Sequence, residues 1–135
     1  MEKQMDWWGL ELITTLVLVV GIVVLGPLIK RYGKSYAADV FVASPRTGKS
    51  YLVLMDVAYY LIFGAYVLLT IRFEPPLDWA ETVNAAQLQA ETVRVAGLLI
   101  LMGLLHGLNV ITLPIIGRLL SLNRSLDEDI ESKAA

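Results

Sequence analysis

His106, the only histidine of the chain, is followed one helical turn later by Asn109 inside a long apolar run. Polar side chains at such a depth in a membrane are costly, and they must face protein, a cavity or a bound group. An imidazole there could ligate haem iron, hydrogen-bond a quinone carbonyl or relay protons. The other interpretation is a hydrogen bond to a neighbouring helix, which contributes only about 0.6 to 2 kcal/mol to packing. The pair is a candidate cofactor site for a quinone or a haem b, although a bis-histidine haem would need a second subunit or a second copy of the chain.

A carboxylate, Asp56, lies inside another apolar run, and Tyr59 and Tyr60 follow it at spacings that put at least one ring on its helix face. A carboxylate buried in a membrane is the kind of group that proton-coupled transporters use. These three residues are therefore candidates for a proton or ion pathway. The other interpretation is an ion pair between Asp56 and a nearby cation, such as Arg46, Lys49 or a basic residue of another subunit.

Two glycines flank the histidine, and a proline follows it. Gly103 and Gly107 are spaced four residues apart, an arrangement that lets another helix approach closely. Pro114 cannot donate to the carbonyl of Val110, so the helix can kink below Asn109 and turn polar backbone toward a partner or a cavity. These glycines and the proline are predicted helix-packing positions.

Residues 43–50 fit a relaxed phosphate-loop pattern, with Ala43 in place of the first glycine. A phosphate loop needs a strand before it, a helix after it and a sheet that supplies a magnesium-binding acid. No sheet can be built from a short segment between two apolar runs, so we predict neither nucleotide binding nor hydrolysis. Arg46 and Lys49 are instead suited to contacts with anionic lipid headgroups.

The elements that carry these residues are three apolar runs, at 10–29, 51–71 and 95–116. Each reaches the roughly 20 residues that cover about 30 Å of hydrocarbon, and lipid offers backbone amides no partners, so the runs must be helices. The sequence thus predicts an all-α membrane protein, with residues 1–135 forming one membrane domain of three transmembrane helices. The lack of cysteine excludes disulfides, and the net charge of -2 without a basic face argues against nucleic acid as a partner.

The charges of the connections predict an orientation. The loop at 30–50 is basic, with Asp39 as its single acid, whereas the segment at 72–94 is acidic. Basic loops stay in the cytoplasm, so we expect the N-terminus outside and the tail at 117–135 inside a bacterial inner membrane. The residues before the first run lack the basic start of a signal peptide, so we expect that run to be retained. Three tryptophans agree with this orientation at the outer interface: Trp7, Trp8 and Trp79.

Local signals predict where the helices end. Pro27 predicts a bend or fraying just before Lys30, and residues 31–50 are expected to form an interfacial loop. Asp78 and Glu81 match a capping box, which predicts one helix from Trp79 through the third span to about Leu120, with its first part projecting outside the membrane.

Two further expectations concern charged residues near the ends of the chain. Glu11 follows Trp8 closely enough to reach water at the outer interface, and the polar tail at 127–135 is expected to be disordered unless a partner holds it.

These features favour a non-catalytic accessory, anchor or scaffold subunit of a larger bacterial inner-membrane complex, docked through the third helix. Its expected partners are other membrane subunits or copies of itself, together with lipid. We expect no catalytic residues, no metal and no cofactor under this hypothesis. One alternative is a quinone- or haem-binding anchor of a respiratory oxidoreductase, using His106. Another is an oligomeric ion- or proton-coupled transporter, using Asp56.

Overall fold

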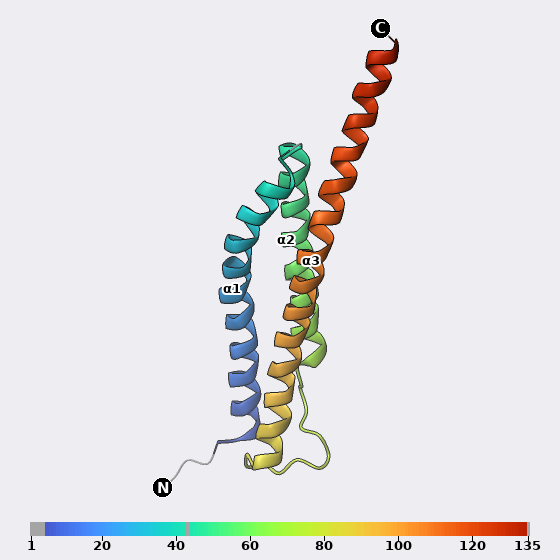
Figure 1. The fold of residues 1–135 in the computed structure, drawn as a ribbon. Coiled ribbons are helices and arrows are strands. Elements are labelled where there is room, and N and C mark those ends of the chain that lie inside the picture. Colours follow the sequence, from blue (N-terminus) through green and yellow to red (C-terminus); the bar gives the residue numbers. More distant parts are fainter. Residues whose placement is uncertain (1–4, 43, 135) are drawn as a thin grey trace.

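The computed structural model describes residues 5–42 and 44–134, which form three long helices (Figure 1). These are α1 (Trp7–Val40), α2 (Pro45–Thr70) and α3 (Ala85–Ala134). Each helix is long and apolar enough to cross a membrane. The predicted all-helical architecture with three candidate membrane spans is therefore confirmed, and the chain has the character of a multi-pass membrane protein.

The first helix is longer than its apolar run. The side chain of Asp6 accepts a hydrogen bond of 2.9 Å from the N–H of Trp7, which caps its start, and the helix passes through Pro27 to Val40. The expected interfacial loop at 31–50 is wrong, because α1 and α2 together take up most of it. The last turns of α1 lean toward the start of α2 (Figure 1). Lys30 consequently lies on a continuous helix facing its neighbours.

The third helix begins later than predicted, at Ala85 rather than Trp79. The actual capping pair is Asn84 and Gln87: the Asn84 Oδ1 accepts from the Gln87 N–H at 3.0 Å, and the Gln87 Oε1 accepts from the Asn84 N–H at 2.8 Å. This reciprocal arrangement satisfies two amide groups of the first turn. The Gln87 side chain also donates to the carbonyl of Ala80 at 2.8 Å, which ties the preceding segment to the helix.

Backbone pairing explains why the helix cannot start at Trp79. The N–H of Val83 donates to the carbonyl of Met5 at 3.1 Å, and the N–H of Trp7 donates to the carbonyl of Glu81 at 3.4 Å. Between these bonds, Asp6 and Thr82 form an antiparallel bridge. Because the bridge holds the backbone extended, the predicted start of the helix at Trp79 is wrong, and this end of α3 lies beside the start of α1.

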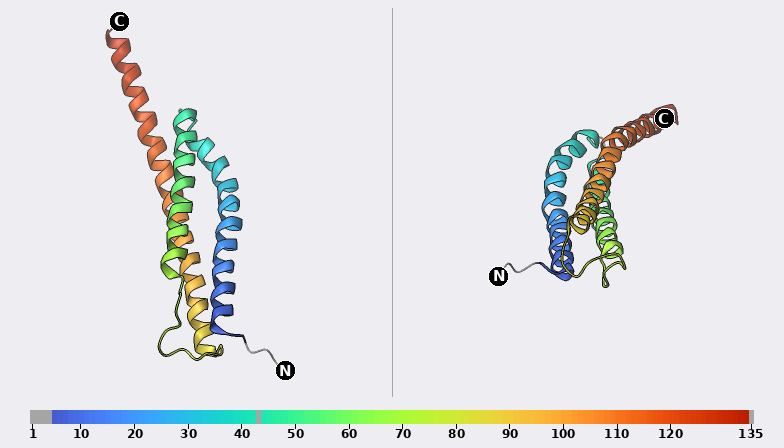
Figure 2. Two further views of the ribbon diagram at one scale, coloured as in Figure 1. Left: turned by 180° about the vertical axis from the view of Figure 1, so that it is seen from behind. Right: turned by 90° about the horizontal axis from the view of Figure 1, so that it is seen from below.

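The opposite end of α3 extends past the other two helices (Figures 1 and 2). Near Gly117 it contacts Val40, the last residue of α1, and it then continues to Ala134. At about 1.5 Å per residue, residues 118–134 lengthen the rod by roughly 25 Å. The predicted disorder of 127–135 is thus replaced by helix as far as Ala134, and Ala135 lies outside the described residues.

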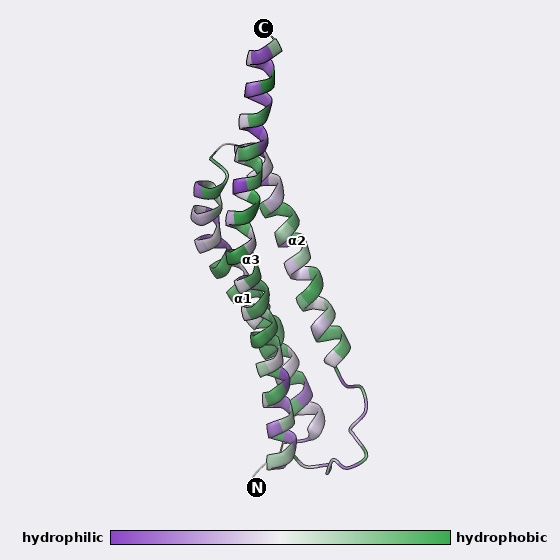
Figure 3. Ribbon diagram, turned by 45° about the vertical axis from the view of Figure 1, so that its right-hand side comes forward, coloured by the Kyte–Doolittle hydropathy of each residue, from purple (hydrophilic) through white to green (hydrophobic). Residues whose placement is uncertain are grey.

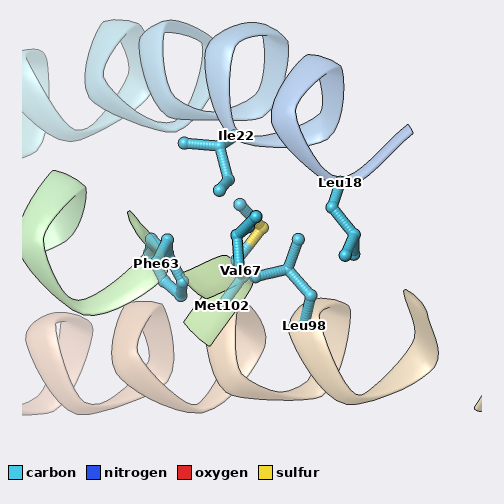
Figure 4. Close-up of a cluster of buried hydrophobic side chains, with 6 residues drawn as sticks. All are labelled: Leu18, Ile22, Phe63, Val67, Leu98 and Met102. Carbon is cyan, nitrogen blue, oxygen red and sulfur yellow. The ribbon is translucent and has the colours of Figure 1, made fainter. Parts of the chain in front are cut away.

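One apolar cluster joins the three helices (Figure 4). All six of its members are at most 7% exposed, and α1 contributes Leu18 and Ile22, α2 Phe63 and Val67, and α3 Leu98 and Met102. The ring of Tyr59 packs edge-on against Phe63, with centroids 4.3 Å apart. Apolar residues occupy the middle of the helices (Figure 3), and most of their side chains outside the cluster are exposed, as lipid-facing residues are.

Candidate functional site

A cavity of about 320 Å³ lies between the three helices, toward the end where α1 meets α2. Its lining is mostly apolar and includes Phe63, Met102 and Leu105. The polar groups among its lining residues come from every helix: Lys30, Tyr32 and Tyr36 from α1, Tyr51, Asp56 and Tyr59 from α2, and His106 and Asn109 from α3.

The cavity unites two candidate sites that the sequence treats separately. His106 and Asn109, predicted as cofactor residues, line it together with Asp56 and Tyr59 of the predicted ion pathway. Tyr60 is not among its lining residues and is exposed. The predicted packing residues are also outside it, since Gly103, Gly107 and Pro114 do not line the cavity.

Asp56 forms an ion pair with Lys30, which joins α2 to α1. The sequence named Arg46 and Lys49 as possible partners, and it missed Lys30 because α1 was expected to fray at Pro27. Both side chains are partly exposed, at 40% for Lys30 and 30% for Asp56. The charge of each group is matched by the other, so the pair adds no net charge to the cavity.

Two tyrosine hydroxyls donate to backbone carbonyls at the cavity. The Tyr59 hydroxyl donates to the carbonyl of Ile22 at 3.3 Å, and the Tyr36 hydroxyl donates to that of Val110 at 3.4 Å. The Val110 carbonyl is the one that Pro114 leaves without its helical donor, so Tyr36 supplies a replacement. Sequence reasoning found the freed carbonyl but not the tyrosine on α1 that reaches it.

His106 and Asn109 make no side-chain hydrogen bond to any other described residue. The space around Gly103 and Gly107 is also open, because nothing described lies within 4 Å of a methyl group placed there. Close helix approaches occur at other glycines, such as Gly26, where a methyl group would lie 2.8 Å from the Tyr59 ring. No other described part of the chain therefore packs against the face of α3 at Gly103 and Gly107.

A second polar site, which the sequence did not predict, closes the other end of the bundle. Arg94 donates to Glu11 at 2.7 Å and to Glu91 at 3.0 Å, and Arg72 forms a further ion pair with Glu91. The Arg72 backbone N–H donates to Glu11 at 2.9 Å. We call these four residues the buried ion cluster.

The expectation that Glu11 reaches water is wrong. The Glu11 and Arg94 side chains are each 4% exposed, and that of Glu91 is 3% exposed. Arg94 also donates to the hydroxyl of Thr70 at 3.0 Å, while the Arg72 guanidinium lies 4.7 Å from the centre of the Trp79 ring. Two features of the sequence could have indicated this cluster. Glu91 and Arg94 are one turn apart directly before the third apolar run, and Glu11 is a lone acid inside the first run.

The remaining sequence candidates take ordinary structural positions. Of the phosphate-loop-like segment, residues 45–50 form the first turns of α2, Ser44 shares a 2.8 Å hydrogen bond with Thr47, and Ala43 lies outside the described residues. Within 5–42 and 44–134, no three His, Asp or Glu side chains gather as metal ligands.

Comparison with known proteins found no matching family model, no similar curated protein and no similar solved structure.

Proposed function

We propose that this chain is a non-catalytic accessory subunit of a larger bacterial inner-membrane complex, docked to a partner through the C-terminal extension of α3. The observation that carries this proposal is an apolar stripe on residues 118–134. Four side chains form it, each between 58% and 65% exposed: Leu119, Leu122, Leu126 and Ile130.

The stripe is expected to pack against another protein segment, because it lies beyond the third apolar run at 95–116. Its residues recur at spacings of three and four, which places them on one side of the helix. Most charged and hydroxyl residues of 118–134 lie on the other side, and Lys133 follows the stripe at its end. Arg118 precedes the stripe, and the segment beyond it is too polar to remain in hydrocarbon. Burying each side chain of this size against another protein would contribute about 1.5 to 3 kcal/mol. An amphipathic helix laid against the stripe is the simplest cover.

The charges favour a different protein over a second copy. Asp127 and Asp129 lie on opposite edges of the stripe, and with Glu128 and Glu131 they give this end of the helix four acids against one base, Lys133. Two copies inserted with the same orientation would pack their extensions in parallel and bring these acids together, which is unfavourable. A partner helix with an apolar stripe and basic edges would be attracted instead.

The test is a photo-cross-linking residue in place of Leu122, activated in native membranes. We expect it to trap another membrane subunit, and the double variant Leu122→Gln/Leu126→Gln to lower co-purification of that subunit at least tenfold, which corresponds to about 1.4 kcal/mol. The matched control, Ser121→Gln/Ser132→Gln, changes the polar side and should leave co-purification unaltered. A cross-linked product made only of two copies of this 14.9 kDa chain, or a double variant that keeps its partner, would contradict the proposal.

The proposal includes the orientation expected from the charges, with the extension of α3 in the cytoplasm. The basic segment at 30–50 lies where α1 meets α2, toward the end of the bundle from which the extension of α3 leaves, whereas the acidic connection between α2 and α3 lies at the other end (Figure 1). A phosphatase reporter, active only outside the cytoplasm, should be inactive when fused after Ala135 and active when inserted near Asp78. Activity in the opposite pattern would reverse the orientation.

A further inference from the structure

We infer that the cavity between the helices binds the head group of a lipid-soluble quinone. This inference goes beyond the docking proposal and does not depend on it, since every group involved belongs to this chain. The cavity volume of about 320 Å³ lies within the range of roughly 300 to 1,000 Å³ that is typical of small-molecule sites.

Unused hydrogen-bonding groups point to a ligand. Several polar side chains line the cavity without a hydrogen bond to any described residue, including those of His106, Asn109 and Tyr51. An imidazole, an amide and a phenol can each donate one hydrogen bond while remaining neutral. Leaving such groups unpaired within a membrane is costly, so a bound molecule that accepts hydrogen bonds would be stabilised there.

The charge balance selects a neutral acceptor over a phosphate. Lys30, the cation that lines the cavity, is paired with Asp56, so little positive charge remains for an anionic headgroup. Carbonyl oxygens of a quinone accept hydrogen bonds without carrying a charge. Phe63, Met102 and Leu105 supply apolar surface for the ring, and the isoprenoid tail would lie in the surrounding lipid.

A haem is a poorer fit to the same residues. His106 is the only histidine of the chain, so a bis-histidine haem would require a second copy or another subunit. A quinone head group requires only hydrogen-bond donors and apolar contacts, and one chain supplies both.

The test uses an azido derivative of ubiquinone with the full chain purified into nanodiscs. Illumination should label peptides containing 51–63 or 102–113, and excess decylubiquinone should abolish that labelling. We expect His106→Leu/Asn109→Leu to reduce labelling at least tenfold, while Asn123→Leu, on the extension beyond the bundle, leaves it unchanged.

A second variant retains the hydrogen-bond donors of the cavity and fills its volume. Gly33 lines the cavity, and nothing described lies within 4 Å of a methyl group built on it, so a side chain can begin there without a clash. We expect the ring of Gly33→Phe to occupy the cavity. It should block labelling, whereas Gly21→Phe, on α1 outside this cavity and also in open space, should not. Labelling that survives both the double variant and Gly33→Phe, or that phosphatidylglycerol rather than decylubiquinone competes away, would overturn the inference.

Discussion

Replacing Arg94 with Gln is expected to destabilise the folded bundle by about 3 to 5 kcal/mol, because two buried carboxylates then lose their shared cation. Arg94 bonds both Glu11 and Glu91, and all three side chains are at most 4% exposed. An unpaired buried charge is far more costly than an absent ion pair, so the loss should exceed that of an ordinary surface substitution. The shift is measurable as a lower midpoint of unfolding when sodium dodecyl sulfate is titrated into mixed micelles.

A matched control separates the buried ion cluster from ion pairs in general. Arg124 forms an exposed pair with Glu128 on the C-terminal extension, with side chains 64% and 70% exposed. Arg124→Gln should therefore change stability by no more than about 0.5 kcal/mol. Adding Glu11→Gln to Arg94→Gln should recover part of the loss, since Glu91 keeps its ion pair with Arg72 and no uncompensated charge remains in the cluster. Equal midpoints for the Arg94 and Arg124 variants would show that the cluster is not buried in the folded protein.

Phe63→Ala is expected to cost about 3 to 5 kcal/mol through the cavity it leaves in the apolar cluster. The Phe63 side chain is fully buried, and it belongs to the apolar cluster to which all three helices contribute (Figure 4). In lipid the loss comes from packing contacts rather than from exposure to water, because neighbouring atoms lose their partners. The same detergent titration measures the change.

The control for this substitution is Phe73→Ala. Phe73 lies in the connection between α2 and α3 and is 75% exposed, so its replacement should change stability by no more than about 0.5 kcal/mol. If Phe63→Ala unfolded at the midpoint of the unmodified protein, the three helices would not pack around this residue.

Apolar length predicted the fold class because a single apolar run of about 20 residues satisfies its own backbone within lipid only as a helix, and this holds for any sequence with such runs. The residues at which the helices begin and end depended on contacts between segments distant in the sequence. Asn84 and Gln87 form a recognisable capping pair, yet Asp78 and Glu81 gave a competing signal. The backbone pairing of residues 81–83 with residues 5–7 decided between them, and no local pattern encodes it.

The candidate site was predictable in pieces. The spacing of residues within a helix predicted that His106 lies beside Asn109 on α3 and that Asp56 lies beside Tyr59 on α2. That both pairs line one cavity depends on how α2 and α3 pack, which spacing does not determine. The ion pair between Glu11 and Arg94 joins residues 83 positions apart, so the sequence showed two charges near membrane ends without showing that they meet.

The buried ion cluster also sets an order of events during synthesis. Glu11 emerges from the ribosome with the first helix, long before Arg94 has been made, and a lone carboxylate is disfavoured in hydrocarbon. We therefore expect α1 to wait with Glu11 at the headgroup level until α3 arrives and supplies the counter-charge. The end of the bundle that holds the buried ion cluster would then be completed last, by the final helix. A nascent chain that stopped before Arg94 would present an uncompensated acid, a feature by which membrane quality control could distinguish unfinished from finished molecules.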